Sequence, residues 1–315
     1  MAAHHSKNAE FWLALLELGD TEEEQRQNWN YYCYWKLALV IAQLVESDER
    51  QRIKERVSLP DDQMKAGVRR QLQDFVKQQG GHPTLPSDPS GEIRSFMDFS
   101  GREFPEDVSF AGRILIGVDF RDTEFKERAD FSGAEFLGPT YFDNAEFHTT
   151  QLSMAEPAMQ RASFAGSKFH GFASFCKTQF PLNARFNGAE FHQGAWFYRA
   201  RFPGRFVRGD LNRAQVTFRS SQFHEMTSFK RVEFGADTEF DYAEMAGRTN
   251  FRGTRFHGSV RFYNCGFRST TSFSGAVFWR PPEFFEAELH EDTDFRGADW
   301  TKAESSYQRS IGRDE

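Results

Sequence analysis

The chain has 315 residues, a net charge of −7 and 39% hydrophobic residues, and 36 of its residues are phenylalanine. Its three cysteines, Cys33, Cys176 and Cys265, are too few and too scattered for a disulfide framework or a cysteine-based metal motif. The first ten residues are polar and lack the apolar core of a signal peptide, so we expect a reducing, cytoplasmic setting.

Residues 1–81 are predicted to form an α-helical N-terminal region. Residues 9–18 are amphipathic and end at Gly19, and Asp20 or Thr21 can cap a long second helix that runs to about Val57. A third helical pattern covers residues 61–79. The proline-rich segment 82–95 is interpreted as a linker to the rest of the chain.

The segment 31–45 is the most apolar part of this region. Only Lys36 and Gln43 interrupt it, and it is shorter than the roughly 20 residues that a membrane span requires. We therefore expect no membrane span and a helix buried on a protein surface. Contact with a membrane and formation of a homodimer through these helices remain open.

Residues 96–300 repeat with a period of 11. Large apolar residues alternate 5 and 6 positions apart, and a small residue stands two positions before each of them, as in the column Phe229, Phe240, Phe251, Phe262, Phe273, Phe284 and Phe295. This spacing predicts short strands rather than a coiled coil, whose apolar residues fall 3 or 4 apart. Glycines recur every 22 residues, at 166 and 188 and again at 253, 275 and 297. The sequence therefore predicts a mainly β, four-sided solenoid of about 22 residues per coil, with one glycine corner in each coil.

Two places break this pattern. Ser153 and Ala158 stand at column positions where the other coils have large side chains, which predicts a local distortion. Phe202 and Phe218 are 16 residues apart, so the later columns are shifted by one residue. We interpret this as the loss of one residue, with a tightened corner or a loop near 203–217.

The repeating units resemble those of the pentapeptide-repeat proteins, in particular the phenylalanine-rich branch with alternating 5 and 6 spacing. The units ADFSG (129–133), AEFHQ (189–193), TNFRG (249–253) and GDLNR (209–213) carry this resemblance. It implies a right-handed quadrilateral β-helix over residues 96–300, with 301–315 as a C-terminal tail or cap. It implies little about activity, because most members have no known biochemical role.

Charge is banded along the repeat. Residues 98–156 hold 13 acids and 5 bases, residues 161–231 hold 3 acids and 12 bases, and residues 233–299 hold 12 acids and 7 bases. Since residues one coil apart stack in a solenoid, the basic band is a candidate partner-binding patch. Its members are Arg199, Arg201, Arg205, Arg208, Arg213 and Arg219. The alternative is a solvated surface whose charges pair with the neighbouring acidic bands.

The sequence contains no phosphate-binding loop, nucleophile elbow or metal-ligand spacing, so we expect no enzyme, no cofactor and no metal. The favoured interpretation is a scaffold that binds another protein, and an acidic protein is one candidate. The resemblance adds a second hypothesis, because some pentapeptide-repeat proteins imitate duplex DNA with an acidic surface and inhibit or protect DNA gyrase or topoisomerase. The third is binding of a nucleic acid or an anionic membrane through the arginine-rich band 199–219. Nucleic acid is the less favoured partner, because the aromatic rings are expected inside the solenoid.

Overall fold

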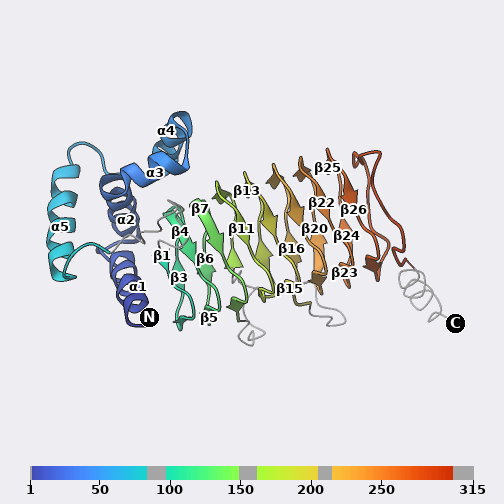
Figure 1. Cartoon of the computed structure of the whole chain (residues 1–315), viewed down its shortest axis with the longest axis horizontal. Helices are drawn as coiled ribbons and strands as arrows, with labels where there is room; N and C mark the ends of the chain where they lie inside the picture. Colours follow the sequence, from blue (N-terminus) through green and yellow to red (C-terminus); the bar gives the residue numbers. More distant parts are fainter. Residues whose placement is uncertain (1, 84–96, 149–161, 205–214, 301–315) are drawn as a thin grey trace.

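The computed structural model describes residues 2–83, 97–148, 162–204 and 215–300. Helices gather at the N-terminal end of a long four-sided β-solenoid (Figure 1). The helices are α1 (Ala2–Leu16), α2 (Glu22–Lys36), α3 (Ala38–Leu44), α4 (Ser47–Arg56) and α5 (Lys65–Gln78). The predicted order of a helical region followed by a solenoid is confirmed.

The strands lie in parallel register on four faces, numbered here in the order in which the chain visits them within a coil. Face 1 contains β4 (Ile114–Asp119), β7 (Glu135–Tyr141), β10 (Lys168–Phe169), β13 (Glu190–Phe191), β17 (Gln222–Phe223), β21 (Glu244–Met245) and β25 (Gly266–Phe267). Face 2 contains β1 (Met97–Asp98), the ends of β4 and β7, and then β11 (Ala173–Ser174), β14 (Ala195–Trp196), β18 (Thr227–Ser228), β22 (Thr249–Asn250) and β26 (Thr271–Ser272).

Faces 3 and 4 complete each coil. Face 3 contains β2 (Glu103–Phe104), β5 (Glu124–Phe125), β8 (Glu146–Phe147), β15 (Arg201–Phe202), β19 (Glu233–Phe234), β23 (Arg255–Phe256) and β27 (Val277–Phe278). Face 4 contains β3 (Val108–Ser109), β6 (Ala129–Asp130), β9 (Ala162–Ser163), β12 (Ala184–Arg185), β16 (Gln215–Thr217), β20 (Asp237–Glu239) and β24 (Val260–Arg261).

Four columns of buried side chains, one behind each face, form the core of the solenoid. Behind face 2, Phe175 and Phe197 stack with ring centroids 4.8 Å apart and ring planes 5° apart. Rings of different columns meet edge to face, as Phe186 and Phe197 do at 85°. Each such aromatic pair contributes about 0.5–1.5 kcal/mol beyond the burial of its surface. The small residues two positions before the rings, such as Ala173, are buried beside them, as the sequence predicts.

Two corners of each coil carry a residue with positive φ. The corner between faces 4 and 1 holds Gly133, Gly166 and Gly188, whereas the corner between faces 2 and 3 holds Gly253, Gly275 and Gly297. The prediction of a single glycine corner is therefore wrong, because the two glycine series mark different corners. Other coils place side chains at the same angle, and Arg199 has a φ of 58°. A residue with a Cβ loses roughly 1–2 kcal/mol in this conformation.

The first irregularity is an insertion between faces 3 and 4. Phe164 stacks on Phe131 with centroids 4.9 Å apart and planes 3° apart, although the two residues are 33 positions apart in the sequence. The column behind face 4 therefore passes directly from Phe131 to Phe164, and the column behind face 1 passes directly from Phe136 to Phe169. The prediction that Ser153 and Ala158 occupy these columns is wrong. Both lie outside the described residues. Eleven extra residues equal two sides of a coil, so the insertion leaves the sequence period unchanged.

The second irregularity is an insertion at the same corner. Phe218 stacks on Phe186 at 4.7 Å across 32 positions, while Phe202 stacks on Phe180 at 4.4 Å across the usual 22. Ten residues have been gained between Phe202 and Phe218, so the predicted loss of one residue is wrong.

The helical region departs from the sequence expectation at its centre. The single helix predicted up to about residue 57 is divided into α2, α3 and α4 by Leu37 (φ −111°, ψ 15°) and Val45 (φ −139°, ψ 147°). Neither break has a glycine or proline, and the turn at Leu37 lets Leu37 and Ile41 face the core. Thr21 caps α2 as predicted, accepting a hydrogen bond from the Glu24 backbone at 3.2 Å.

Helix α2 covers the edge of face 1 at Ile114–Ile116 of β4, where no residue that the structure describes forms a preceding strand. The Asn30 side chain donates to the Gly112 carbonyl at 2.9 Å and accepts from the Ile114 backbone N–H at 2.9 Å. Trp29 Nε1 donates to the Ile114 carbonyl at 2.7 Å. Farther along, Arg56 Nε of α4 donates to the buried carboxylate of Glu135 at 2.6 Å. These bonds replace the partners that a neighbouring strand would supply at this edge.

Candidate functional site

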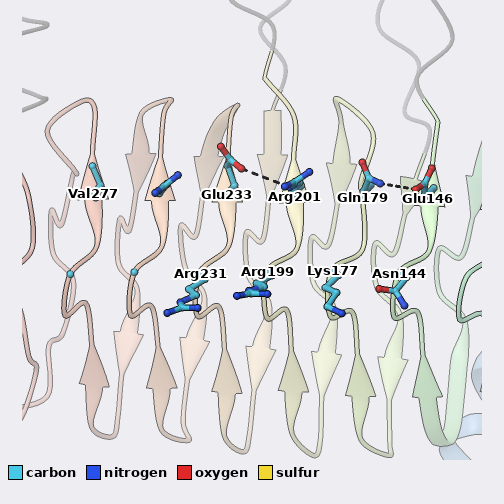
Figure 2. Close-up of a pocket in the computed structure, with 12 residues that line it drawn as sticks. Asn144, Glu146, Lys177, Gln179, Arg199, Arg201, Arg231, Glu233 and Val277 are labelled. Carbon is cyan, nitrogen blue, oxygen red and sulfur yellow. Dashed lines mark hydrogen bonds and ion pairs between the residues drawn. The ribbon is translucent and has the colours of Figure 1, made fainter.

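Basic side chains form a ridge along the corner between faces 2 and 3. Lys177, Arg199 and Arg231 occupy the same position on three consecutive coils (Figure 2). Each lies two residues after a ring of the column behind face 2. All three are exposed and have φ values of 57–59°. Their backbone N–H groups donate to the next coil, as Lys177 does to the Tyr198 carbonyl at 2.8 Å. The corner therefore holds the backbone firmly and directs three cationic side chains outward.

A groove of about 840 Å³ lies between this ridge and the outer side of face 3. The other side of the groove is a row of residues from successive coils, namely Glu146, Gln179, Arg201, Glu233, Arg255 and Val277. Figure 2 shows the ridge and the row as two parallel lines of side chains, joined within the row by Gln179 to Glu146 and Arg201 to Glu233. The ridge carries only positive charge, whereas the row carries both signs.

The three ridge charges are not paired within the described part of the chain. Lys177, Arg199 and Arg231 form no ion pair with any residue that the structure describes. Arg199 packs over the Tyr198 ring at 5.2 Å. The nearest pairing in the groove, Arg201 to Glu233, is 3.9 Å long and exposed, so it contributes little. The positive potential of the ridge is therefore available to a partner.

The basic surface continues toward the C-terminal end of the same corner. A second hollow of about 440 Å³ is lined by the basic residues Lys230, Arg231, Arg252 and Arg296 and by three glycines. The glycines are Gly253, Gly275 and Gly297, which take the ridge position in the later coils. Here a partner can approach the backbone of Gly275 and Gly297, where an added Cβ would meet no side chain within 4 Å.

Of the six arginines predicted for this patch, the structure brings two together. Arg199 and Arg201 line the groove. Arg219 follows the ring of Phe218 at the corner between faces 4 and 1, which is diagonally opposite. Arg205, Arg208 and Arg213 lie outside the described residues.

The sequence prediction missed Lys177, Arg231 and Arg255, which share the groove with Arg199 and Arg201. The signal that identifies the two ridge residues is their position two residues after a column ring. A comparison of that position in successive coils identifies them, whereas the run of arginines along the chain does not.

The histidines that follow column rings differ in their exposure. His170 is buried, and its Nε2 lies 2.8 Å from a Glu135 carboxylate oxygen. The rings of His170, His192 and His224 stack on consecutive coils at 4.9 Å. Within the described residues, no group of three or more His, Cys, Asp or Glu side chains is arranged to hold a metal ion. None of the described helices has the length and apolar character that a membrane crossing requires.

Comparison with known proteins gives one family match. The family described as "Pentapeptide repeats (9 copies)" matches residues 158–201. No curated protein matches the chain. Among solved structures, a trypsin-treated form of QnrB1, a plasmid-mediated fluoroquinolone resistance protein, is 14% identical over 68% of this chain and 95% of its own length, with a TM-score of 0.18. The family match covers 44 of the 315 residues and lies within the part of the chain where four-sided coils stack around columns of phenylalanine, so this segment of the solenoid is built of pentapeptide repeats.

Proposed function

We propose that this protein is a non-enzymatic scaffold that binds an acidic protein partner in the groove between faces 2 and 3. The observation that supports this is the ridge of Lys177, Arg199 and Arg231, which is exposed, repeats on three coils and forms no ion pair with any described residue. Aligned cations on a rigid surface attract and orient a complementary acidic surface. Strand spacing sets the ridge charges about 4.8 Å apart along the axis.

The groove favours a protein over a nucleic acid. Glu146 and Glu233 line it together with the cations, so a uniformly negative chain laid along it meets repulsion at two of its coils. A folded acidic surface can place basic groups opposite these two carboxylates. The basic groove also interrupts the sustained acidic surface that imitation of duplex DNA requires. We therefore favour protein binding over the hypothesis of a gyrase inhibitor or protector.

The remaining parts of the proposal concern the ends and the setting of the scaffold. We propose that residues 1–81 act as the N-terminal cap, residues 82–95 as the linker, and residues 301–315 as a tail or second cap. The contacts of α2 with β4 support the first assignment. The three cysteines are free, which supports a reducing, cytoplasmic setting. Homodimerisation through the helices stays a prediction, tested by the mass of the protein in solution.

The test removes the ridge without disturbing the fold. Glycine already occupies the ridge position in three later coils, so the chain itself shows which substitution the corner accepts. The test variant is Lys177→Gly, Arg199→Gly, Arg231→Gly. A control variant removes the same charge from exposed positions outside the groove, using residues found at the same place in other coils. It is Arg185→Ser, Arg219→Ser, Arg248→Thr.

Binding of polyglutamate, single-stranded DNA and duplex DNA is measured by calorimetry for the three proteins, and each protein is used to capture partners from host lysate. We expect polyglutamate binding to fall roughly tenfold or more in the test variant alone, since each exposed pair is worth up to about 1 kcal/mol. Equal losses in both variants would show that only net charge matters. If either DNA bound more tightly than polyglutamate and this binding required the ridge, the proposed partner would be a nucleic acid and not a protein.

A further inference from the structure

A second groove lies in the helical region, away from the basic ridge. It has a volume of about 420 Å³, which falls in the range of about 300–1,000 Å³ that ligand-binding pockets occupy. Three aromatic side chains of α2, Tyr31, Tyr34 and Trp35, line it together with Ala38 and Ile41 of α3. The Tyr31 and Trp35 rings lie 15° from parallel with centroids 6.5 Å apart. The lining on this side is therefore apolar and largely flat-faced.

Cationic side chains line the opposite side. Arg50 and Lys54 come from α4, and Lys65 comes from the start of α5. The Lys54 ammonium lies 5.8 Å from the centre of the Tyr34 ring. Arg50 Nε is shielded from solvent and has no hydrogen-bond partner among the described residues. The residues that line this groove include no aspartate or glutamate.

Two exposed apolar residues are sequence neighbours of residues that line the groove. Leu39, next to Ala38, has 83% of its surface exposed, and Met64, next to Lys65, has 47% exposed. An apolar side chain seated in the groove would bury the aromatic lining. The groove therefore combines one hydrophobic position with several positions for negative charge.

We propose that this groove binds a short acidic segment of a protein partner that carries one aromatic or aliphatic anchor. The anchor packs on Tyr34 and Trp35, and the neighbouring carboxylates of the segment pair with Arg50 and Lys54. An anchor in a pocket surrounded by polar contacts is the usual arrangement of a tight peptide site. This site is separate from the basic ridge and does not depend on the function proposed for it.

Two other occupants fit less well. A second copy of the chain docked face to face would bring Arg50 and Lys54 against their own counterparts, since a two-fold contact uses the same surface twice. An anionic membrane would take up the exposed Leu39, but its surface does not fill the hollow that the rings of Tyr31, Tyr34 and Trp35 line. Both occupants serve as outcomes of the test.

The probe is a fluorescein-labelled peptide of aspartate, glutamate and glycine with a single central phenylalanine, titrated with the full chain and followed by anisotropy. A matched peptide replaces the phenylalanine by alanine. The test variant is Lys54→Glu. The control is Arg52→Glu, which changes the charge equally on the same helix but does not line the groove; the Arg52 side chain is 69% exposed. Circular dichroism and the melting temperature verify that both variants are folded.

We expect Lys54→Glu to weaken binding about tenfold or more and Arg52→Glu to weaken it less than about threefold, because only the first reverses a charge at the site. The alanine peptide should also bind about tenfold more weakly. Equal effects of the two variants, or equal binding of the two peptides, would overturn the proposal. So would binding of phosphatidylserine vesicles without binding of the peptide, or a dimer that Lys54→Glu abolishes.

Discussion

Replacing arginine by glycine is expected to have opposite effects at two positions only two residues apart. Arg199 stands at the ridge corner with a φ of 58°, a conformation that costs a residue with a Cβ roughly 1–2 kcal/mol. Arg201 begins strand β15 on face 3, where glycine has no such advantage. The two side chains share the groove, so their surroundings are otherwise matched.

For Arg199→Gly, the expected change in the free energy of unfolding is the sum of two opposing effects. Arg199→Gly relieves the corner, but it adds about 0.5–1 kcal/mol of conformational freedom to the unfolded chain. The net expectation is a gain of about 0.5–1 kcal/mol in the free energy of unfolding. Arg201→Gly has only the unfavourable term, so we expect a loss of about 0.5–1 kcal/mol. Its 3.9 Å contact with Glu233 adds little to that loss.

Thermal unfolding followed by circular dichroism measures the difference. A change of 1 kcal/mol shifts the melting temperature by about 2–4 °C in a domain of this size, so the two variants should separate clearly on either side of the native protein. The reverse substitution Gly275→Arg is the internal check. An added Cβ there meets no heavy atom within 4 Å, and φ is 63°, so only the backbone term applies and the melting temperature should fall. A decrease for Arg199→Gly as large as that for Arg201→Gly would refute the reasoning.

Two further predictions concern the helical region and the stability of the fold at acidic pH. Asn30→Ala leaves the Gly112 carbonyl and the Ile114 N–H without their partners, and we expect a loss of about 2–4 kcal/mol in denaturant unfolding; a loss below 1 kcal/mol would mean that α2 does not protect the edge of β4. His192, whose Nε2 lies 3.5 Å from a Glu190 carboxylate oxygen, and Lys168 lower the pKa of Glu190 to about 2 from its ordinary value of 4.5. A lowered carboxyl pKa stabilises the fold above pH 4.5, and this contribution disappears as the pH falls toward 2. Glu190→Gln should therefore flatten the dependence of the melting temperature on pH in that window, and unchanged slopes would contradict the assignment.

The columns could be predicted from the sequence because every coil must fill the same interior positions with side chains of similar size and shape. A ring at Phe175 requires another ring one coil later, and the chain supplies Phe197. The insertions could not be predicted correctly from the period. Eleven extra residues before Phe164 span two sides of a coil, so the phase of the repeat survives and Ser153 falls at a column position by coincidence.

The candidate site was only partly predictable for a related reason. Arg199 and Arg201 are neighbours in sequence and lie together, but Lys177 and Arg231 reach them only by stacking of successive coils. Which residues stack depends on the true length of each coil, and that length changes between Phe202 and Phe218. The breaks at Leu37 and Val45 depend on packing of the helices, which no local pattern records.

The cover that α2 forms over the edge of β4 has a consequence for how this molecule can vary. Because one end is closed and every coil presents the same four columns, a duplicated or deleted coil leaves the packing above and below it intact. Each such event moves the basic ridge relative to the aromatic groove of the helices by one strand spacing, about 4.8 Å, along the axis. The number of coils between β4 and Lys177 therefore sets the distance between the two grooves for which we propose partners.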